Sequence, residues 1–227
     1  MKRKIITTSD GSKTIQIEEW DEQYHSKHGA VQEAYHVFIK HGLSLFENRK
    51  ISILEIGFGT GLNALITWKE SKRSNLVVAY TGVEAFPVTK EEVEQLDYIN
   101  ELQAKELASG FDKMHDSPWE ETIVLTDNFS LHKQQKDFMD IVDKEQHDLI
   151  YFDAFGARVQ PELWTETLFQ KMYDALCSNG ILVTYAAKGS VRRAMLAVGF
   201  KVERLPGPPG KREMLRAVKI DLAQDKS

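Results

Sequence analysis

The chain has 227 residues with 42% hydrophobic and 28% charged content, a balance that is typical of a folded globular protein and excludes disorder as the default. Its only cysteine, Cys177, excludes an intramolecular disulfide and a zinc site built from cysteines, which favours a cytoplasmic protein. The formal net charge of −5 excludes binding of nucleic acid by bulk attraction, and no stretch approaches the roughly 18 apolar residues of a membrane span.

The chain is predicted to open with a β-hairpin followed by a helix. Apolar residues alternate over residues 4–8 and 14–18, and Asp10-Gly11 between these segments is a favoured hairpin turn. Apolar residues at helical spacing then predict a helix over residues 30–46.

Short apolar strands alternate with helices along most of the remaining chain. The predicted strands are residues 51–56, 77–83, 122–125, 149–152 and 181–185. The predicted helices are residues 62–71, 90–107, 130–143, 161–177 and 191–198. This alternation predicts an α/β fold with a Rossmann-like, doubly wound and mostly parallel sheet. We expect one domain, in which residues 1–48 form an N-terminal extension and residues 49–227 form the core.

The C-terminal part of the chain differs in pattern and charge. Residues 201–205 and 214–220 are strand-like, and the prolines and glycines of residues 206–210 between them predict a hairpin. Between residues 186 and 220 basic side chains outnumber acidic ones, which are only Glu203 and Glu213. Such a segment is either a solvated face or a contact surface for nucleic acid.

A glycine-rich loop connects the first core strand to its helix. It reads Gly57-Phe58-Gly59-Thr60-Gly61, and glycines at such a turn let backbone N–H groups approach a ligand closely. A kinase-type phosphate loop is excluded, because no Gly-Lys-Ser/Thr follows, and a dinucleotide fingerprint would place its third glycine two residues later. The acidic Glu55 before the loop favours S-adenosylmethionine, whose ammonium and sulfonium groups are cationic, over a pyrophosphate.

Polar side chains follow several of the predicted strands, where an α/β sheet binds its ligands. Glu84 ends the second core strand and is expected to accept the ribose hydroxyls of a nucleoside. Asp127 follows the third strand and is a candidate contact for the adenine amino group. Asp153 is expected to face the transferred methyl group, and Phe155 to stack on a planar substrate. Surface acids, a helix-capping Asp153 and a core Phe155 are the structural alternatives.

The sequence gives no trusted pattern of metal ligands. His25, His28, His36 and His41 lie on a charged amphipathic stretch, and surface positions explain them better than a metal site does. We therefore expect no metal.

Several segments together resemble one known family. They are Asp10-Gly11-Ser12, Gly29-Ala30-Val31-Gln32-Glu33, Leu54-Glu55-Ile56-Gly57-Phe58-Gly59-Thr60-Gly61-Leu62-Asn63, Val83-Glu84-Ala85-Phe86-Pro87, Tyr151-Phe152-Asp153-Ala154-Phe155, Pro161-Glu162-Leu163-Trp164 and Gly210-Lys211-Arg212-Glu213-Met214-Leu215. In this order, across nearly the whole chain, they resemble the methyltransferase half of the tRNA wobble-uridine enzyme MnmC and its stand-alone relatives, called MnmD.

The resemblance implies a reaction and a set of site residues. The family transfers a methyl group from S-adenosylmethionine to the amine of 5-aminomethyl-2-thiouridine in the anticodon loop of certain tRNAs. It implies that Asp153 is the catalytic carboxylate and that Lys211 and Arg212 lie near the substrate. The cofactor pocket that it implies is made by Glu55, Gly57, Gly59, Gly61, Glu84 and, less directly, Asp127.

Two departures from the family pattern affect what can be expected. Relatives carry Phe-Ala-Pro where this chain reads Phe155-Gly156-Ala157, which puts the fit of the substrate in question. The bifunctional relatives continue into a flavin-dependent oxidase domain, whereas this sequence stops at Ser227, so we expect no flavin. The aminomethyl substrate would then be made by other enzymes, to which this chain would be functionally coupled.

Two other functions fit the same residue pattern. One is a transferase that acts on a small amine, of the aminopropyltransferase type, which uses a similar fold and cofactor loop. The other is a non-catalytic RNA-binding module that has kept the fold, although Asp153 and Glu84 favour an enzyme.

Overall fold

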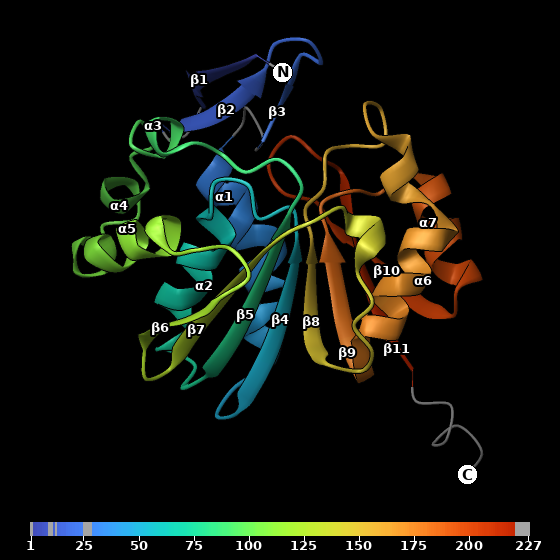
Figure 1. Ribbon diagram of the computed structural model, residues 1–227. Coiled ribbons are helices and arrows are strands. Elements are labelled where there is room, and N and C mark those ends of the chain that lie inside the picture. The colour runs from blue at the N-terminus through green and yellow to red at the C-terminus, as the bar shows by residue number, and fades with distance from the viewer. Residues whose placement is uncertain (1, 9–10, 12, 25–28, 221–227) are drawn as a thin grey trace.

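The computed structural model describes residues 2–8, 11, 13–24 and 29–220 of the chain. Strands β1 (Arg3–Thr7) and β2 (Lys13–Ile17) pair antiparallel, and the short β3 (Glu22–Gln23) extends them to a small three-stranded sheet. The predicted hairpin is confirmed, although Asp10 of its predicted turn lies outside the described residues. The small sheet lies above the ends of the central strands (Figure 1).

An eight-stranded sheet in the order β10-β11-β9-β8-β4-β5-β7-β6 forms the centre of the molecule. Its strands are β4 (Lys50–Ile56), β5 (Val77–Glu84), β6 (Thr122–Thr126), β7 (Phe129–Gln135), β8 (His147–Phe152), β9 (Leu176–Thr184), β10 (Phe200–Pro206) and β11 (Glu213–Lys219). The central strands from β9 to β7 are parallel, and β10, β11 and β6 are antiparallel to their neighbours. The doubly wound fold and the C-terminal hairpin are therefore confirmed.

Helices cover both faces of this sheet (Figure 1). They are α1 (Ala30–Ala34), α2 (Leu62–Ser71), α3 (Lys90–Val93), α4 (Tyr98–Glu101), α5 (Ala108–Asp116), α6 (Glu166–Ala175) and α7 (Gly189–Ala197). The predicted helix over residues 62–71 is confirmed. The helix predicted over residues 30–46 is divided, since α1 continues as a π-helix, Tyr35–Lys40, and then a 3-10 turn, Leu43–Leu45.

Two other predicted helices are also shorter or broken. Residues 90–107 form α3, α4 and a 3-10 turn, Lys105–Leu107, instead of one helix, and α5 was not predicted. The predicted helix over residues 161–177 begins as a 3-10 turn, Pro161–Trp164, and Cys177 already belongs to β9.

The helix predicted over residues 130–143 was wrong, because the first part of that segment belongs to the strand β7 and the rest holds only a 3-10 turn, Phe138–Asp140. Phe129, Leu131 and Lys133 alternate with more exposed residues, as a strand requires. Lys133 disguises this pattern, since a lysine is counted as exposed although only 2% of it is accessible here. Its ammonium donates to the carbonyl of His115 and lies 5.0 Å from the centre of the Trp119 ring.

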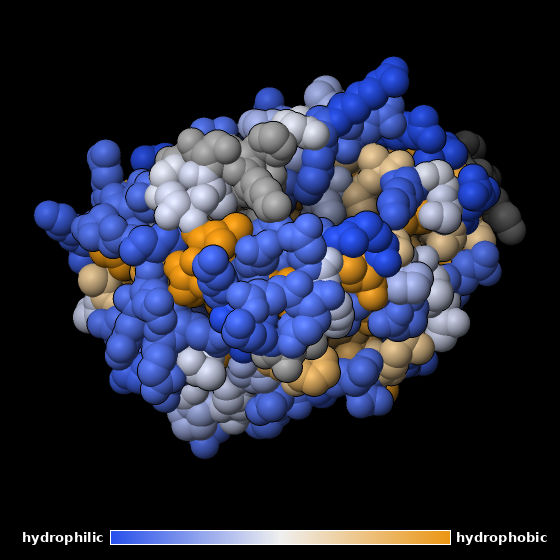
Figure 2. All heavy atoms as spheres, turned by 90° about the horizontal axis from the view of Figure 1, so that it is seen from above, coloured by the Kyte–Doolittle hydropathy of each residue, from blue (hydrophilic) through white to orange (hydrophobic). Residues whose placement is uncertain are grey.

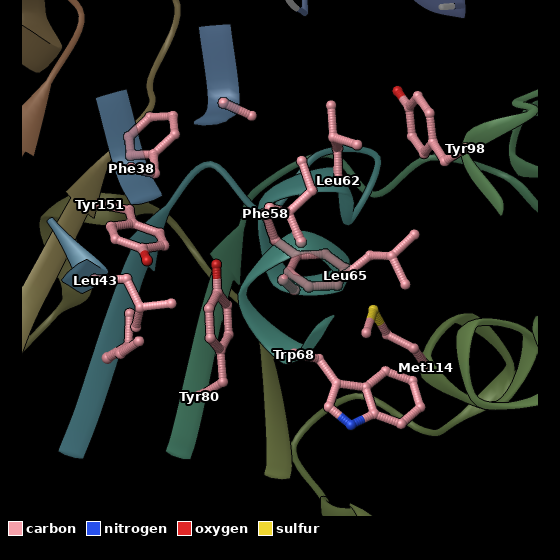
Figure 3. Packing of buried hydrophobic residues seen from close by; sticks show 14 of the residues in the cluster. Phe38, Leu43, Phe58, Leu62, Leu65, Trp68, Tyr80, Tyr98, Met114 and Tyr151 are labelled. Carbon is pink, nitrogen blue, oxygen red and sulfur yellow. The ribbon is translucent and has the colours of Figure 1, made fainter. Parts of the chain in front are cut away.

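Side chains on the two faces of β4 belong to two separate hydrophobic clusters. Ile51 and Ile53 pack into the cluster beneath α2, and Leu54 and Ile56 pack into the one beneath α6 and α7. Burial on both faces explains the continuous apolar run of this strand. Within the first cluster, aromatic side chains from β5, β8 and the N-terminal helical segment gather, among them Tyr80, Tyr151 and Phe38 (Figure 3).

Candidate functional site

A cavity of about 410 Å³ opens at the carboxyl ends of the parallel strands, beneath the small N-terminal sheet. It lies at the boundary between β4 and β8. From β4 the next parallel strands, β5 and β7, are added on one side, and β8 and β9 are added on the other, so the strand order reverses here. Such a reversal is the usual ligand site of these sheets. Its volume is within the range of small-molecule sites. Seen from above, hydrophobic residues reach this end of the molecule in separate patches between hydrophilic side chains (Figure 2).

The glycine loop forms one wall of the cavity and requires glycine for steric reasons. Gly57 has φ +90°, and a Cβ on it would lie 2.7 Å from the carbonyl oxygen of Asp153. Gly59 has φ +49°, and its Cβ would lie 3.0 Å from the ring of Tyr24. The loop thus packs against both the end of β8 and the N-terminal sheet, in a conformation that side chains with a Cβ disfavour. Gly61, also with positive φ, caps α2.

Glu84 lies at the end of β5 and holds the glycine loop in place. Its Oε2 accepts from the N–H of Gly59 at 3.0 Å, and its Oε1 accepts from the N–H of Phe86 at 2.9 Å. Burial raises the pKa of this carboxyl, while these backbone donors oppose the shift. Each oxygen keeps a lone pair for a further donor, and Glu84 lines the cavity.

Asp153 lies at the end of β8 and lines the same cavity. Its Oδ2 accepts a 2.8 Å hydrogen bond from Nδ2 of Asn63, which also donates to Oε1 of Glu55 at 2.9 Å. The hydroxyl of Tyr80 donates to the other oxygen of Glu55 at 2.8 Å. Glu55 is fully buried and does not line the cavity, so the structure places it one layer below the surface of the site.

The charge of Asp153 depends on its surroundings. Its pKa is raised to about 7, mainly by burial and also by the nearby Glu33 carboxylate, while the Asn63 hydrogen bond and the Lys211 ammonium oppose the shift. A carboxyl with a pKa near neutrality exchanges protons readily under physiological conditions. Asp153 is thus suited to accept a proton or to face a cation.

Lys211 and Arg212, which were predicted to lie near the substrate, have different environments. The ammonium of Lys211 is 2.6 Å from Oε2 of the buried Glu33 and 3.8 Å from the centre of the Tyr185 ring, a ring that lines the cavity. Arg212 is exposed. The structure therefore directs the charge of Lys211 inward and leaves that of Arg212 at the surface.

Aromatic side chains form the opposite wall of the cavity. The ring of Phe155 lies 5.5 Å from that of Trp20 and 5.0 Å from that of Tyr24, both edge to face. Arg158 donates to the carbonyl of Trp20 at 3.0 Å and pairs with Glu22, which fastens this side of the small sheet to the core. Trp20 also lines the cavity, which no sequence pattern had indicated.

Arg3 fastens the other side of the small sheet. Its guanidinium donates to the carbonyls of Phe86 and Pro87, at 2.6 and 3.1 Å, and pairs with Glu92 at 3.0 Å. The small sheet therefore covers the cavity while being held to the core at both ends.

Asp127 is not brought to the site. It lies in the turn between β6 and β7, which are antiparallel. This turn is at the amino end of β5, where the carbonyl of Asn128 accepts a hydrogen bond from the N–H of Val78. The acidic residue that lines the cavity at this place is Asp137, after the parallel strand β7. Its identification required the direction of β7, which the wrong helix prediction concealed.

The remaining lining residues include two that the sequence reasoning had passed over. Asn63 and Tyr24 line the cavity. Glu33 does not line it but lies close enough to Asp153 to raise the pKa of that carboxyl. Asn63 and Glu33 do occur in the segments that resemble the family, and that resemblance was the available signal. Among the described residues no group of histidine, cysteine and acidic side chains is arranged to hold a metal ion. No helix in the described part of the chain is long and apolar enough to cross a membrane.

Comparison with known proteins agrees with this geometry. A family model described as S-adenosyl-L-methionine-dependent methyltransferase matches residues 113–220. The bifunctional protein MnmC of Idiomarina loihiensis, named for tRNA 5-methylaminomethyl-2-thiouridine biosynthesis, is 31% identical over 86% of this chain, and that of Aromatoleum aromaticum is 32% identical over 94%. The chain is therefore similar to S-adenosyl-L-methionine-dependent methyltransferases and to MnmC proteins. The chain spans about a third of the length of each of these relatives, 35% in both cases.

Solved structures show a likeness in fold. MNMC2 from Aquifex aeolicus superposes with a TM-score of 0.73 at 26% identity, covering 96% of this chain and 70% of that one. A spermidine synthase in complex with the transition state analogue AdoDATO superposes with a TM-score of 0.60 over 96% of this chain and 71% of that one, but at 16% identity this likeness shows the fold alone. The cofactor of the family is S-adenosylmethionine.

Proposed function

We propose that this methyltransferase transfers a methyl group from S-adenosylmethionine to the amine of 5-aminomethyl-2-thiouridine at the tRNA wobble position. The position of Asp153 carries the proposal, since a partly buried carboxyl with a pKa of about 7 lies in the cavity. The likeness to MnmC proteins, which are named for this modification, supports the choice of substrate.

The residues around the cavity fit the cofactor. Glu84 would accept the ribose hydroxyls, and Asp137 takes the place that the sequence had given to Asp127 as the contact for the adenine amino group. Phe86 and Met139 are apolar, line the cavity and are exposed by 59% and 37%, so they would cover the base. Gly57 and Gly59 leave room for a ligand beside the loop.

The chemistry asks little covalent help from the protein. The bound cofactor supplies an electrophilic methyl group, and only a neutral amine has the lone pair that attacks it. Asp153 would accept the proton that the amine loses, orient the nitrogen, and stabilise the positive charge that develops on it. Arg3, Glu22 and Gln23 of the small sheet line the cavity, and the sheet would limit the access of water to this step.

The aromatic wall fits an unstacked base. Single-stranded anticodon bases are commonly read by stacking on aromatic side chains. Phe155, Trp20 and Tyr24 form such a surface beside Asp153. A Cβ on the glycine that follows Phe155, where relatives carry alanine, would lie 3.7 Å from the hydroxyl of Tyr185, an ordinary van der Waals contact. This part of the departure from the family pattern therefore needs no rearrangement of the wall.

An RNA backbone would contact exposed basic side chains in the C-terminal part of the chain. Four basic side chains of residues 186–220 are in ion pairs: Arg204, Lys211, Arg216 and Lys219. Three others are exposed and form no ion pair with the described residues: Lys188 and Arg193 near α7, and Arg212 in the loop between β10 and β11. These three residues are the proposed phosphate contacts, which reconciles RNA binding with a net negative chain.

The direct test is methyl transfer to tRNA that carries 5-aminomethyl-2-thiouridine, with the product nucleoside identified by mass spectrometry. We expect 5-methylaminomethyl-2-thiouridine to form, and tRNA that carries 2-thiouridine without the aminomethyl group to remain unmodified. Transfer to free small amines without tRNA would favour the aminopropyltransferase-like alternative. Binding of tRNA without affinity for S-adenosylmethionine would favour the RNA-binding module.

A further inference from the structure

Asn63 makes two hydrogen bonds with one end of its side chain and none with the other. Nδ2 donates to Asp153 and to Glu55, at 2.8 and 2.9 Å. Oδ1 is buried and finds no partner among the described residues, although Asn63 lines the cavity and is only 3% exposed. A buried amide oxygen without a donor is costly and requires an explanation.

The orientation of this amide follows from its neighbours. Asp153 and Glu55 can only accept hydrogen bonds when ionised, so the amide must present its N–H groups to them. The reverse orientation would bring a third acceptor oxygen against two acids. The observed orientation is therefore the favoured one whenever either acid is ionised, and Oδ1 then needs a donor from outside the described part of the chain.

We propose that Asn63 is a positioning and binding residue of the site. Its Nδ2 holds Asp153, and its Oδ1 accepts a hydrogen bond from an N–H group of the bound ligand. The inference rests on the proposed function. The shared chemistry of the ligand is an ammonium or amine nitrogen. Both reactants offer one, since S-adenosylmethionine has an α-ammonium group and the proposed acceptor has an aminomethyl group.

The charged groups around Asp153 make the role of Asn63 measurable. Glu33 from α1 raises the pKa of Asp153, and Lys211 from the loop before β11 lowers it. The Asn63 hydrogen bond lowers this pKa as well, so its loss should raise the pKa further above 7. Glu55 on β4 shares the Asn63 amide with Asp153, and burial together with the charge of Asp153 raises the pKa of Glu55.

The experiment uses Asn63→Leu, which keeps the approximate volume of the side chain but removes both donor and acceptor. Calorimetry measures its affinity for S-adenosylmethionine, and single-turnover methyl transfer to aminomethyl-thiouridine tRNA is followed from pH 5 to pH 9. We expect the inflection of the rate against pH to move upward. We also expect one affinity to fall by about tenfold, as when a hydrogen bond to a charged group is lost.

The two ligand sources are distinguished by which affinity falls. Weaker binding of S-adenosylmethionine assigns Oδ1 to the cofactor, and unchanged cofactor affinity with a raised KM for tRNA assigns it to the acceptor amine. An unchanged inflection, or affinities that both stay within twofold of wild type, would overturn the proposal. If wild-type protein does not methylate this tRNA, the proposed function fails, while the cofactor affinity of the variant still decides the role of Asn63.

Asn128→Leu is the matched control. Its side chain amide donates to Ser71 and to the carbonyl of Leu76, away from the cavity, so it should reduce stability without moving the inflection. If Asn63→Leu does not fold, the smaller Asn63→Ser takes its place. Because a serine hydroxyl could still donate to Asp153, Asn63→Ala is measured beside it; alanine neither donates nor accepts, so the pH shift should keep its direction, and an unchanged inflection in Asn63→Ala would likewise contradict the role of Asn63.

Discussion

The ammonium of Lys211 lies 2.6 Å from Oε2 of Glu33, whose side chain is only 8% exposed to solvent. The pair stands beside Asp153, whose pKa Glu33 raises and Lys211 lowers. Lys211→Ala should therefore move the inflection of the rate against pH upward, and Glu33→Gln should move it downward. Single-turnover rates from pH 5 to pH 9 measure both shifts, and shifts in the same direction would contradict the electrostatic role.

Arg212 should behave differently from its neighbour Lys211. Arg212→Ala should weaken tRNA binding and reduce the salt slope by about one, because one phosphate contact is lost. The pH profile should not change. Binding titrations across salt concentrations measure the slope, with Lys201→Ala at the opposite end of β10 as an exposed basic control. Equal slopes for wild type and Arg212→Ala would return this residue to the solvated face.

Asp153→Asn should abolish most turnover and stabilise the fold at alkaline pH. The folded pKa of about 7 lies above the ordinary value of 3.8, so stability from the protonated carboxyl is complete below about pH 4 and is lost as the pH rises through 7. Each pKa unit corresponds to about 1.4 kcal/mol. Thermal unfolding at pH 5 and pH 8 should show the larger gain at pH 8, on the order of 2 kcal/mol. A loss of stability at pH 8 would mean that the ionised carboxylate supports the fold.

Glu84→Ala and Asp137→Ala should each weaken the binding of S-adenosylmethionine by about tenfold, since each removes a charged hydrogen-bond acceptor from the cavity. Asp127→Ala is the control, because this residue lies at the opposite end of β7 and does not line the cavity. Calorimetry at one pH compares the three variants. Weaker binding in Asp127→Ala, with normal binding in Asp137→Ala, would reverse the assignment that the direction of β7 supports.

Gly57→Ala should destabilise the protein by about 2 kcal/mol or more and weaken cofactor binding, because a Cβ would meet the Asp153 carbonyl at a backbone angle that favours glycine. Gly156→Ala places the same methyl group on the far side of the site, where the nearest atom is 3.7 Å away, and should leave stability nearly unchanged. Denaturant unfolding compares the pair. Similar stabilities would show that the loop adjusts to a side chain at residue 57.

The sequence by itself determined the features that depend on neighbouring residues. An apolar strand, a glycine turn and a helix are contiguous at residues 51–71, and Glu84 and Asp153 directly follow apolar runs, so their places at the ends of strands could be predicted. The family resemblance depended on the same local segments.

Only the tertiary structure decided which distant residues meet. Lys133 is buried because His115 and Trp119 receive its ammonium, and this disguised β7 as a helix. The direction of β7 then placed Asp137 at the cavity in place of Asp127. Burial and pairing across many residues likewise turned Lys211 toward Glu33 and joined Asn63 to Asp153. Hydrophobic periodicity contains no information on such pairs, since their energies arise only when the folded chain excludes water between them.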